Sequence, residues 1–149
     1  MKLKKQLFAE CQKFLNQRLE TIQHTIADIQ NSLLSETKSS AGDKHETGRA
    51  MLQLEREKAG QQLAELQTQI EILQKINPEL SQQNVALGSI VITSGSNYFI
   101  AVSVGEIKLD KKVFYGISAA TPIGKILLSK QAGDTINFRS QKFTILEIA

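Results

Sequence analysis

The chain has 149 residues, a length typical of one compact domain or two small units. Apolar residues make up 41% of it, aromatic residues only 5%, and Trp is absent. Proteins that stack nucleic-acid bases need exposed rings, so this composition argues against such a binder. The net charge is +3, and basic and acidic side chains are nearly balanced in both halves, so sequence-specific or phosphate-driven DNA binding is not predicted.

The cellular compartment is predicted from the cysteine content and the N-terminal region. Cys11 is the one cysteine, so no intrachain disulfide can form, which fits a reducing compartment. Lys2, Lys4 and Lys5 are not followed by the apolar run of about 7–15 residues that a signal peptide needs. No segment approaches the roughly 20 apolar residues that span a membrane. We therefore expect a cytoplasmic protein with no membrane partner, in which Cys11 is a small buried apolar residue.

Residues 3–34 contain no Gly and no Pro, and their apolar positions follow a heptad pattern. Apolar side chains alternate four and three residues apart at Leu15, Leu19, Ile22, Ile26, Ile29 and Leu33. This spacing predicts a helix with a coiled-coil seam, because a strand would have a period of two. Leu7, Cys11 and Phe14 widen the apolar stripe, so we expect the N-terminal end of this helix to pack against more than one partner.

A small polar segment at residues 37–42 predicts a turn, and a second helical pattern follows it. Its seam register comprises Leu52, Arg56, Ala59, Leu63, Leu66, Ile70 and Leu73. This helix should end near Ile76, because Pro78 restricts the residue before it. Two helices of similar length joined by a short turn fold back on each other. We expect an antiparallel coiled-coil hairpin over residues 1–76, with its tip near residues 38–47.

The remaining residues predict a linker at 77–84 and a small strand-rich domain at 85–149. Strands are expected over residues 85–93, 98–104, 113–118, 135–138 and 142–148, and a short helix over 122–130. The candidate core residues are Ile90, Ile92, Phe99, Val102, Ile117, Ile123, Leu127, Leu128, Ile136, Phe143, Ile145 and Ile148. The expected fold class is therefore α+β, a long helical hairpin followed by a small sheet with one short helix.

Sequence signatures of common enzyme classes are missing. The chain has no phosphate-cradling Gly-rich loop and no nucleophile elbow. Its two histidines, His24 and His45, both fall in the helical half, where we expect solvated or packed residues rather than metal ligands. We expect a protein that is not itself an enzyme.

One run of residues in the C-terminal half follows a family pattern. It comprises Ile117-Ser118-Ala119-Ala120-Thr121-Pro122-Ile123-Gly124-Lys125, Leu127-Leu128, Lys130-Gln131-Ala132-Gly133-Asp134-Thr135 and Phe143-Thr144-Ile145-Leu146-Glu147-Ile148. With Gly88-Ser89 at its entrance, it covers most of residues 85–148. This half resembles the C-terminal domain of the bacterial Gre transcript-cleavage factors. The resemblance implies an FKBP-like fold.

The predicted tip carries a second, shorter match. The run Gly42-Asp43-Lys44-His45-Glu46 is similar to the tip of the Gre hairpin, where Gly-Asp is followed by two residues and Glu. The resemblance implies that the hairpin enters the secondary channel of RNA polymerase. There Asp43 and Glu46 would help hold a second Mg²⁺ and its water, and backtracked RNA would be cleaved. The polymerase would remain the enzyme, this protein would be its cofactor, and nascent RNA would be met only indirectly.

Other interpretations of the same residues stay open. Asp43 at the N-cap with Glu46 at N3 also predicts a capping box, and both acids suit the positive end of the helix dipole. Arg49 stands where the Gre pattern has a further acid, which favours a channel-binding regulator that does not stimulate cleavage. A coiled-coil structural or adaptor protein is a further alternative, as is a peptidyl-prolyl isomerase suggested by fold analogy alone.

Overall fold

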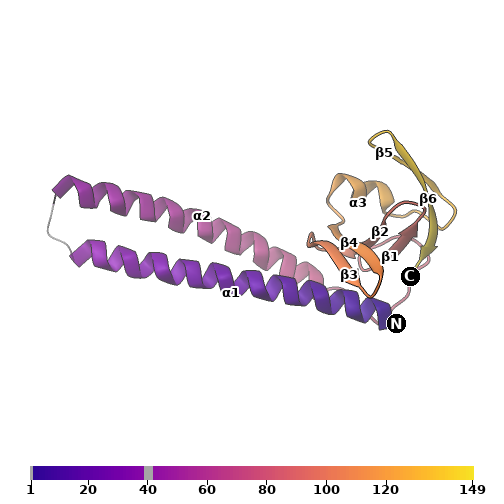
Figure 1. Ribbon diagram of the computed structural model, residues 1–149, viewed down its shortest axis with the longest axis horizontal. Helices are drawn as coiled ribbons and strands as arrows, with labels where there is room; N and C mark the ends of the chain where they lie inside the picture. The colour runs from indigo at the N-terminus through magenta and orange to yellow at the C-terminus, as the bar shows by residue number, and fades with distance from the viewer. Residues whose placement is uncertain (1, 39–41) are drawn as a thin grey trace. The chain divides into compact units, whose positions relative to one another are not determined.

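The computed structural model describes residues 2–38 and 42–149 (Figure 1). In chain order its elements are α1 (Lys2–Lys38), α2 (Gly42–Gln74), β1 (Ile90–Thr93), β2 (Asn97–Ala101), β3 (Gly105–Leu109), β4 (Lys112–Ser118), α3 (Pro122–Leu127), β5 (Thr135–Phe138) and β6 (Gln141–Ile148). The expected α+β class, with two long helices followed by a sheet and one short helix, is confirmed.

The chain divides into two compact units. One comprises Leu15–Ile70, and the other comprises Met1–Phe14 together with Glu71–Ala149. The domain boundaries expected after residues 76 and 84 stay predictions.

In the Leu15–Ile70 unit, α1 and α2 run in opposite directions (Figure 1). Every seam position predicted for this stretch of both helices is buried or half-buried. Ile22 and Ile29 of α1 are 9% and 7% exposed, and Ala59 and Leu66 of α2 are both 4% exposed. An isolated helix leaves all its sides open to solvent, so the facing helix must cover these side chains. The predicted coiled-coil seam is confirmed.

Both helix ends differ from the expected positions. α1 continues to Lys38, two residues into the segment 37–42 that was predicted as a turn, because residues 35–38 are polar but contain neither Gly nor Pro to stop a helix. The predicted turn at 37–42 falls partly on residues 39–41, which lie outside the described residues. α2 ends at Gln74, and the amides of Lys75 and Ile76 then bond the carbonyls three residues earlier, both at 3.1 Å. Such bonds form one tighter turn after the α-helix.

The sheet has the strand order β3-β4-β2-β1-β6-β5, and every neighbouring pair is antiparallel except β2 and β4. The prediction missed β3 altogether. Its pattern alternates exposed Glu106, buried Ile107 and exposed Lys108, and Ile107 pairs with buried Phe114 of β4. The strand is short, begins with Gly105 and is followed by the Asp110–Lys111 turn, so the segment resembles a loop in the sequence.

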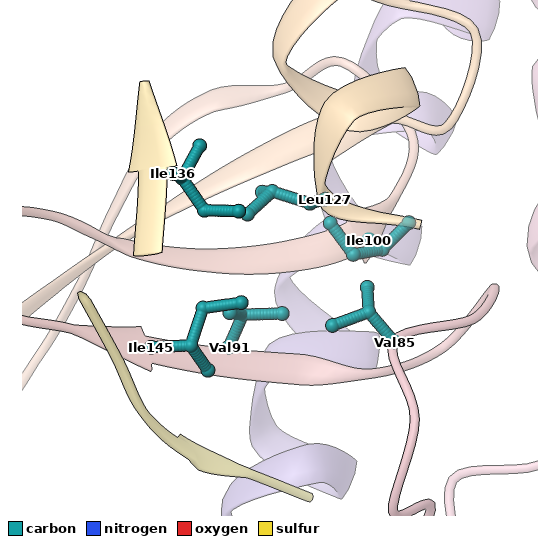
Figure 2. Packing of buried hydrophobic residues seen from close by; sticks show 6 residues of the cluster. All are labelled: Val85, Val91, Ile100, Leu127, Ile136 and Ile145. Carbon is teal, nitrogen blue, oxygen red and sulfur yellow. The ribbon is translucent and has the colours of Figure 1, made fainter. Parts of the chain in front are cut away.

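One hydrophobic core lies on the face of the sheet that packs with α3. Figure 2 shows its six buried members, Val85, Val91, Ile100, Leu127, Ile136 and Ile145. All of the predicted core residues are buried or half-buried. Val85, Val91 and Ile100 of this cluster were missing from the predicted core. Ile90 and Phe99, the chain neighbours of Val91 and Ile100 on the opposite face, are also buried, so β1 and β2 are covered on both faces.

The first turns of α1 belong to the same unit as the sheet. Leu7 and Cys11 are fully buried there, which confirms Cys11 as a buried apolar residue and agrees with more than one packing partner. Lys4 is also buried, and its Nζ donates a 2.6 Å hydrogen bond to the carbonyl oxygen of Leu80. Lys5 Nζ lies 2.6 Å from Glu79 Oε1 at the surface.

Candidate functional site

The candidate site lies at the start of α2. Its backbone is helical from Gly42, so Asp43 and Glu46 stand three residues apart in the first turns of the helix. The Glu46 side chain is exposed to solvent. The side chain of Asp43 lies outside the described residues, so its expected capping and metal-binding roles stay predictions.

Just after the start of α2, one negative charge and one positive charge offset each other. Among residues 46–54, whose side chains the structure describes, Glu46 is the one acid and Arg49 the one base. Arg49 is exposed and follows Glu46 by three residues, so a cation stands within one helical turn of the carboxylate. A neighbouring cation opposes the binding of a metal ion, as the departure from the Gre pattern suggested.

Exposed apolar side chains occur beside this site, and sequence reasoning missed them. Leu34 near the end of α1 is 59% exposed, and Met51 and Leu54 of α2 are 59% and 65% exposed. Met51 and Leu54 are three residues apart and share one face of α2, away from seam residue Leu52. The signal in the sequence is that these residues are large and apolar yet fall outside the seam register.

Among the side chains that the structure describes, which exclude those of residues 36–45, no three His, Cys, Asp or Glu residues are grouped closely enough to hold a metal ion. Asp43 and Glu46 together offer two carboxylates, whereas Mg²⁺ takes six oxygen ligands in near-octahedral geometry. Any Mg²⁺ held at this end of the hairpin would therefore need most of its ligands from water and from a partner.

The side chains with shifted pKa values lie far along the sequence from Glu46. Burial lowers the pKa of Lys4, and a hydrogen bond from Lys5 together with its charge lowers the pKa of Glu79. Burial, with a smaller effect from Glu10, raises the pKa of Cys11 to about 12. A buried thiol with so high a pKa stays protonated and is a poor nucleophile.

The molecule thus combines an antiparallel pair of long helices with a mixed six-stranded sheet and one short helix. No protein-family model matches this chain, and no curated protein matches it. Among solved structures, that of the transcription factor Gfh1 is similar at 23% sequence identity over 90% of each chain, with a TM-score of 0.35.

Neither long helix has a stretch within residues 2–38 and 42–149 that combines the length and apolarity needed to cross a bilayer.

Proposed function

We propose that this protein is a transcription elongation factor that binds RNA polymerase in its secondary channel and acts through the start of α2. The observation that carries the proposal is the antiparallel pair of α1 and α2, whose connection directly precedes Asp43 and Glu46. The resemblance of residues 42–46 and 117–148 to Gre factors supports it. From Leu15 to Lys38, α1 is about 36 Å long, enough to reach a recessed site in a large partner.

The exposed apolar residues fit the same proposal. Met51 and Leu54 lie one to two turns after Glu46 on one face of α2, and Leu34 lies near the end of α1. Inside a channel these side chains would contact the walls and lose their exposure to water, which favours binding. A hairpin that worked only through its carboxylates would have no need of large apolar side chains at these positions.

In the cleavage form of this proposal, the carboxylates of Asp43 and Glu46 add oxygen ligands to a weakly held Mg²⁺ of the polymerase. That ion would activate a water for hydrolysis of backtracked RNA. The chain itself contributes position and negative charge, and the polymerase remains the enzyme.

A second candidate is a channel-binding regulator that does not stimulate cleavage. The exposed guanidinium of Arg49, within one turn of Glu46, is the observation that favours it. In this form the hairpin would obstruct or slow nucleotide traffic, and the acids would serve mainly the helix N-terminus.

The decisive experiment incubates a backtracked elongation complex of the host polymerase with wild-type protein and three variants, and measures short 3′ RNA fragments. Asp43→Asn keeps helix capping but is neutral, and Glu46→Gln removes the second charge. Each should reduce the cleavage rate at least about tenfold, as loss of metal-site groups commonly does. Glu55→Gln is the matched control, because it neutralises an exposed acid elsewhere on α2 and should leave cleavage unchanged.

Other outcomes separate the candidates. Absence of cleavage by the wild type, together with binding and altered elongation, would support the non-cleaving regulator. Loss of binding in a Met51→Ser, Leu54→Ser variant of unchanged melting temperature would support the apolar contact. If the wild type fails to bind the polymerase but forms concentration-dependent oligomers, the protein is a coiled-coil adaptor and the proposal is wrong.

A further inference from the structure

An open groove lies between the turn that joins β1 to β2 and the β5–β6 hairpin. It has a volume of about 310 Å³ and is lined by Ser94, Gly95, Ser96, Tyr98, Phe138, Gln141, Lys142 and Phe143. This volume lies at the lower end of the range of small-ligand sites in proteins, about 300–1,000 Å³. All of its lining residues belong to one compact unit.

Aromatic side chains concentrate at this groove although they are rare in the chain. Tyr98, Phe138 and Phe143 line it and are half-buried, so each ring keeps part of its surface open. The ring centroids of Tyr98 and Phe143 lie 6.4 Å apart at a tilt of 37°, and Tyr115 lies 6.3 Å from Tyr98. Such a set of rings suits an aromatic or large aliphatic side chain of a ligand.

The groove walls are held in place by hydrogen bonds. The amide of Ser94 donates to the carbonyl of Thr144, and the amide of Thr144 donates to Ser94 Oγ, both at 2.9 Å. Thr93 Oγ1 accepts from the amide of Gly95 at 3.0 Å and donates to the carbonyl of Ser96. The β1–β2 turn is therefore fastened to β6, and a ligand would meet a preformed surface with little loss of conformational entropy.

The charge at the groove is positive. Lys142 lines it with an exposed side chain, and the guanidinium carbon of Arg139 stands 5.0 Å from the centroid of the Phe138 ring. Among the lining residues that the structure describes there is no Asp or Glu. Two cations beside three rings complement a carboxylate next to an apolar side chain. A nucleic-acid strand would need a longer track of cations along its phosphates than these two provide.

We propose that this groove binds an acidic peptide segment of a partner protein, with an aromatic or aliphatic side chain seated on Tyr98, Phe138 and Phe143. The flanking carboxylates pair with Lys142 and Arg139, and Gln141 and Ser94 bond peptide groups of the segment. This site lies outside the helical hairpin, and the inference does not rest on the proposed role in transcription.

Tyrosine fluorescence makes the test specific, because the chain has no Trp, Tyr98 lines the groove, and the ring of the other tyrosine, Tyr115, lies next to that of Tyr98. Tyrosine fluorescence of the full chain is titrated with an acetylated and amidated peptide, alanine-aspartate-phenylalanine-glutamate-alanine, which does not emit in that range. We expect a saturable change with a Kd of about 1 mM or tighter. Peptides with asparagine and glutamine in place of the acids, or alanine in place of phenylalanine, should bind more weakly.

Variants locate the binding. Lys142→Gln should weaken the peptide about two- to fivefold, as loss of one exposed charge pair does. Lys125→Gln removes a matched exposed lysine of α3 outside the groove and should leave the Kd unchanged. Absence of a saturable change, or equal binding of the uncharged peptide, would overturn the proposal. Tighter binding of an oligothymidylate that competes with the peptide would overturn it as well, because the groove would then be a platform for nucleic-acid bases.

Discussion

At the scale of single residues, the environment of Cys11 shows how a local pattern and the surrounding fold combine. Its place in the apolar stripe of α1 predicted burial, and the side chain is fully buried. The raised thiol pKa follows from that burial, because a thiolate would lose its hydration there. The burial of Lys4 was not predictable, since its hydrogen-bond acceptor at Leu80 lies 76 positions along the chain.

We predict that Cys11 is inert in the folded protein. At pH 8 its thiolate fraction should be about a thousandfold lower than in the unfolded chain, because its pKa rises from 9.0 to about 12. The same shift determines how Cys11 affects stability as the pH changes. Below pH 9.0 the thiol is protonated in both the folded and the unfolded state. Between pH 9.0 and about 12 the thiol ionises only in the unfolded chain, so the free energy of unfolding falls as the pH rises. The rate of reaction with an aromatic disulfide, measured with and without urea, checks this.

A matched control separates burial from general thiol chemistry. The double variant Cys11→Ala, Gln12→Cys moves the thiol one residue to an exposed position of α1 and should react at a rate close to that of the unfolded chain. Native Cys11 that reacts within about threefold of this control would contradict the prediction, because burial would then give no protection.

At the scale of elements, the turn of the β5–β6 hairpin is strained in a way that the sequence does not show. Arg139 and Ser140 connect the paired residues Phe138 and Gln141, and both have positive φ, 50° and 65°. This is the geometry of a type I′ turn, which Asn-Gly fits best. A non-glycine residue in this region of φ and ψ costs about 1–2 kcal/mol.

We predict that Ser140→Gly stabilises the protein by about 0.5–1 kcal/mol, because glycine relieves the strain while its freer unfolded state offsets part of the gain. Gly105→Ala is the opposing change: φ is 74° in open space, so alanine should cost about 1 kcal/mol through backbone strain alone. Urea denaturation with unchanged slopes measures both effects. A loss of stability in Ser140→Gly would show that the turn is not strained.

In α3, glycine is required at position 124 because of a contact with residues outside the helix. Thr121 Oγ1 accepts a hydrogen bond from the amide of Gly124 at 3.1 Å and donates one to the carbonyl of Ser118 at 2.7 Å. A Cβ on Gly124 would overlap the Ser118 carbonyl oxygen. The Pro at the start of this helix was expected from the sequence. The need for glycine two residues later comes from the close approach of the end of β4.

At the scale of the whole molecule, the two compact units differ in how their side chains are covered. In Leu15–Ile70 each helix buries one seam, whereas β1 and β2 are buried on both faces. Stability within a protein follows the density of buried apolar contacts, so it should be uneven between these parts.

We predict that amide hydrogens of residues 46–54 exchange with solvent at least about a hundredfold faster than those of Phe99 and Ile100 in β2, after correction for intrinsic rates. Hydrogen exchange followed by NMR at neutral pH measures this directly. The amide hydrogens of Leu66 and Ile70 serve as an internal comparison, because these residues lie in the same helix nearer its C-terminal end. Equal protection across α2 and β2 would mean that the molecule opens only as one cooperative unit.

Local periodicity by itself predicted the helical pair. The apolar seam from Leu15 to Leu33 can be buried by any facing helix that has apolar residues at the same spacing. Local periodicity also located most of the strands and the short helix through apolar alternation and turn residues. The tertiary structure alone decided the parallel pairing of β2 with β4, the covering of both sheet faces and the groove at Tyr98. These depend on contacts between residues far apart in the sequence, and no local pattern records which distant element will cover a given face.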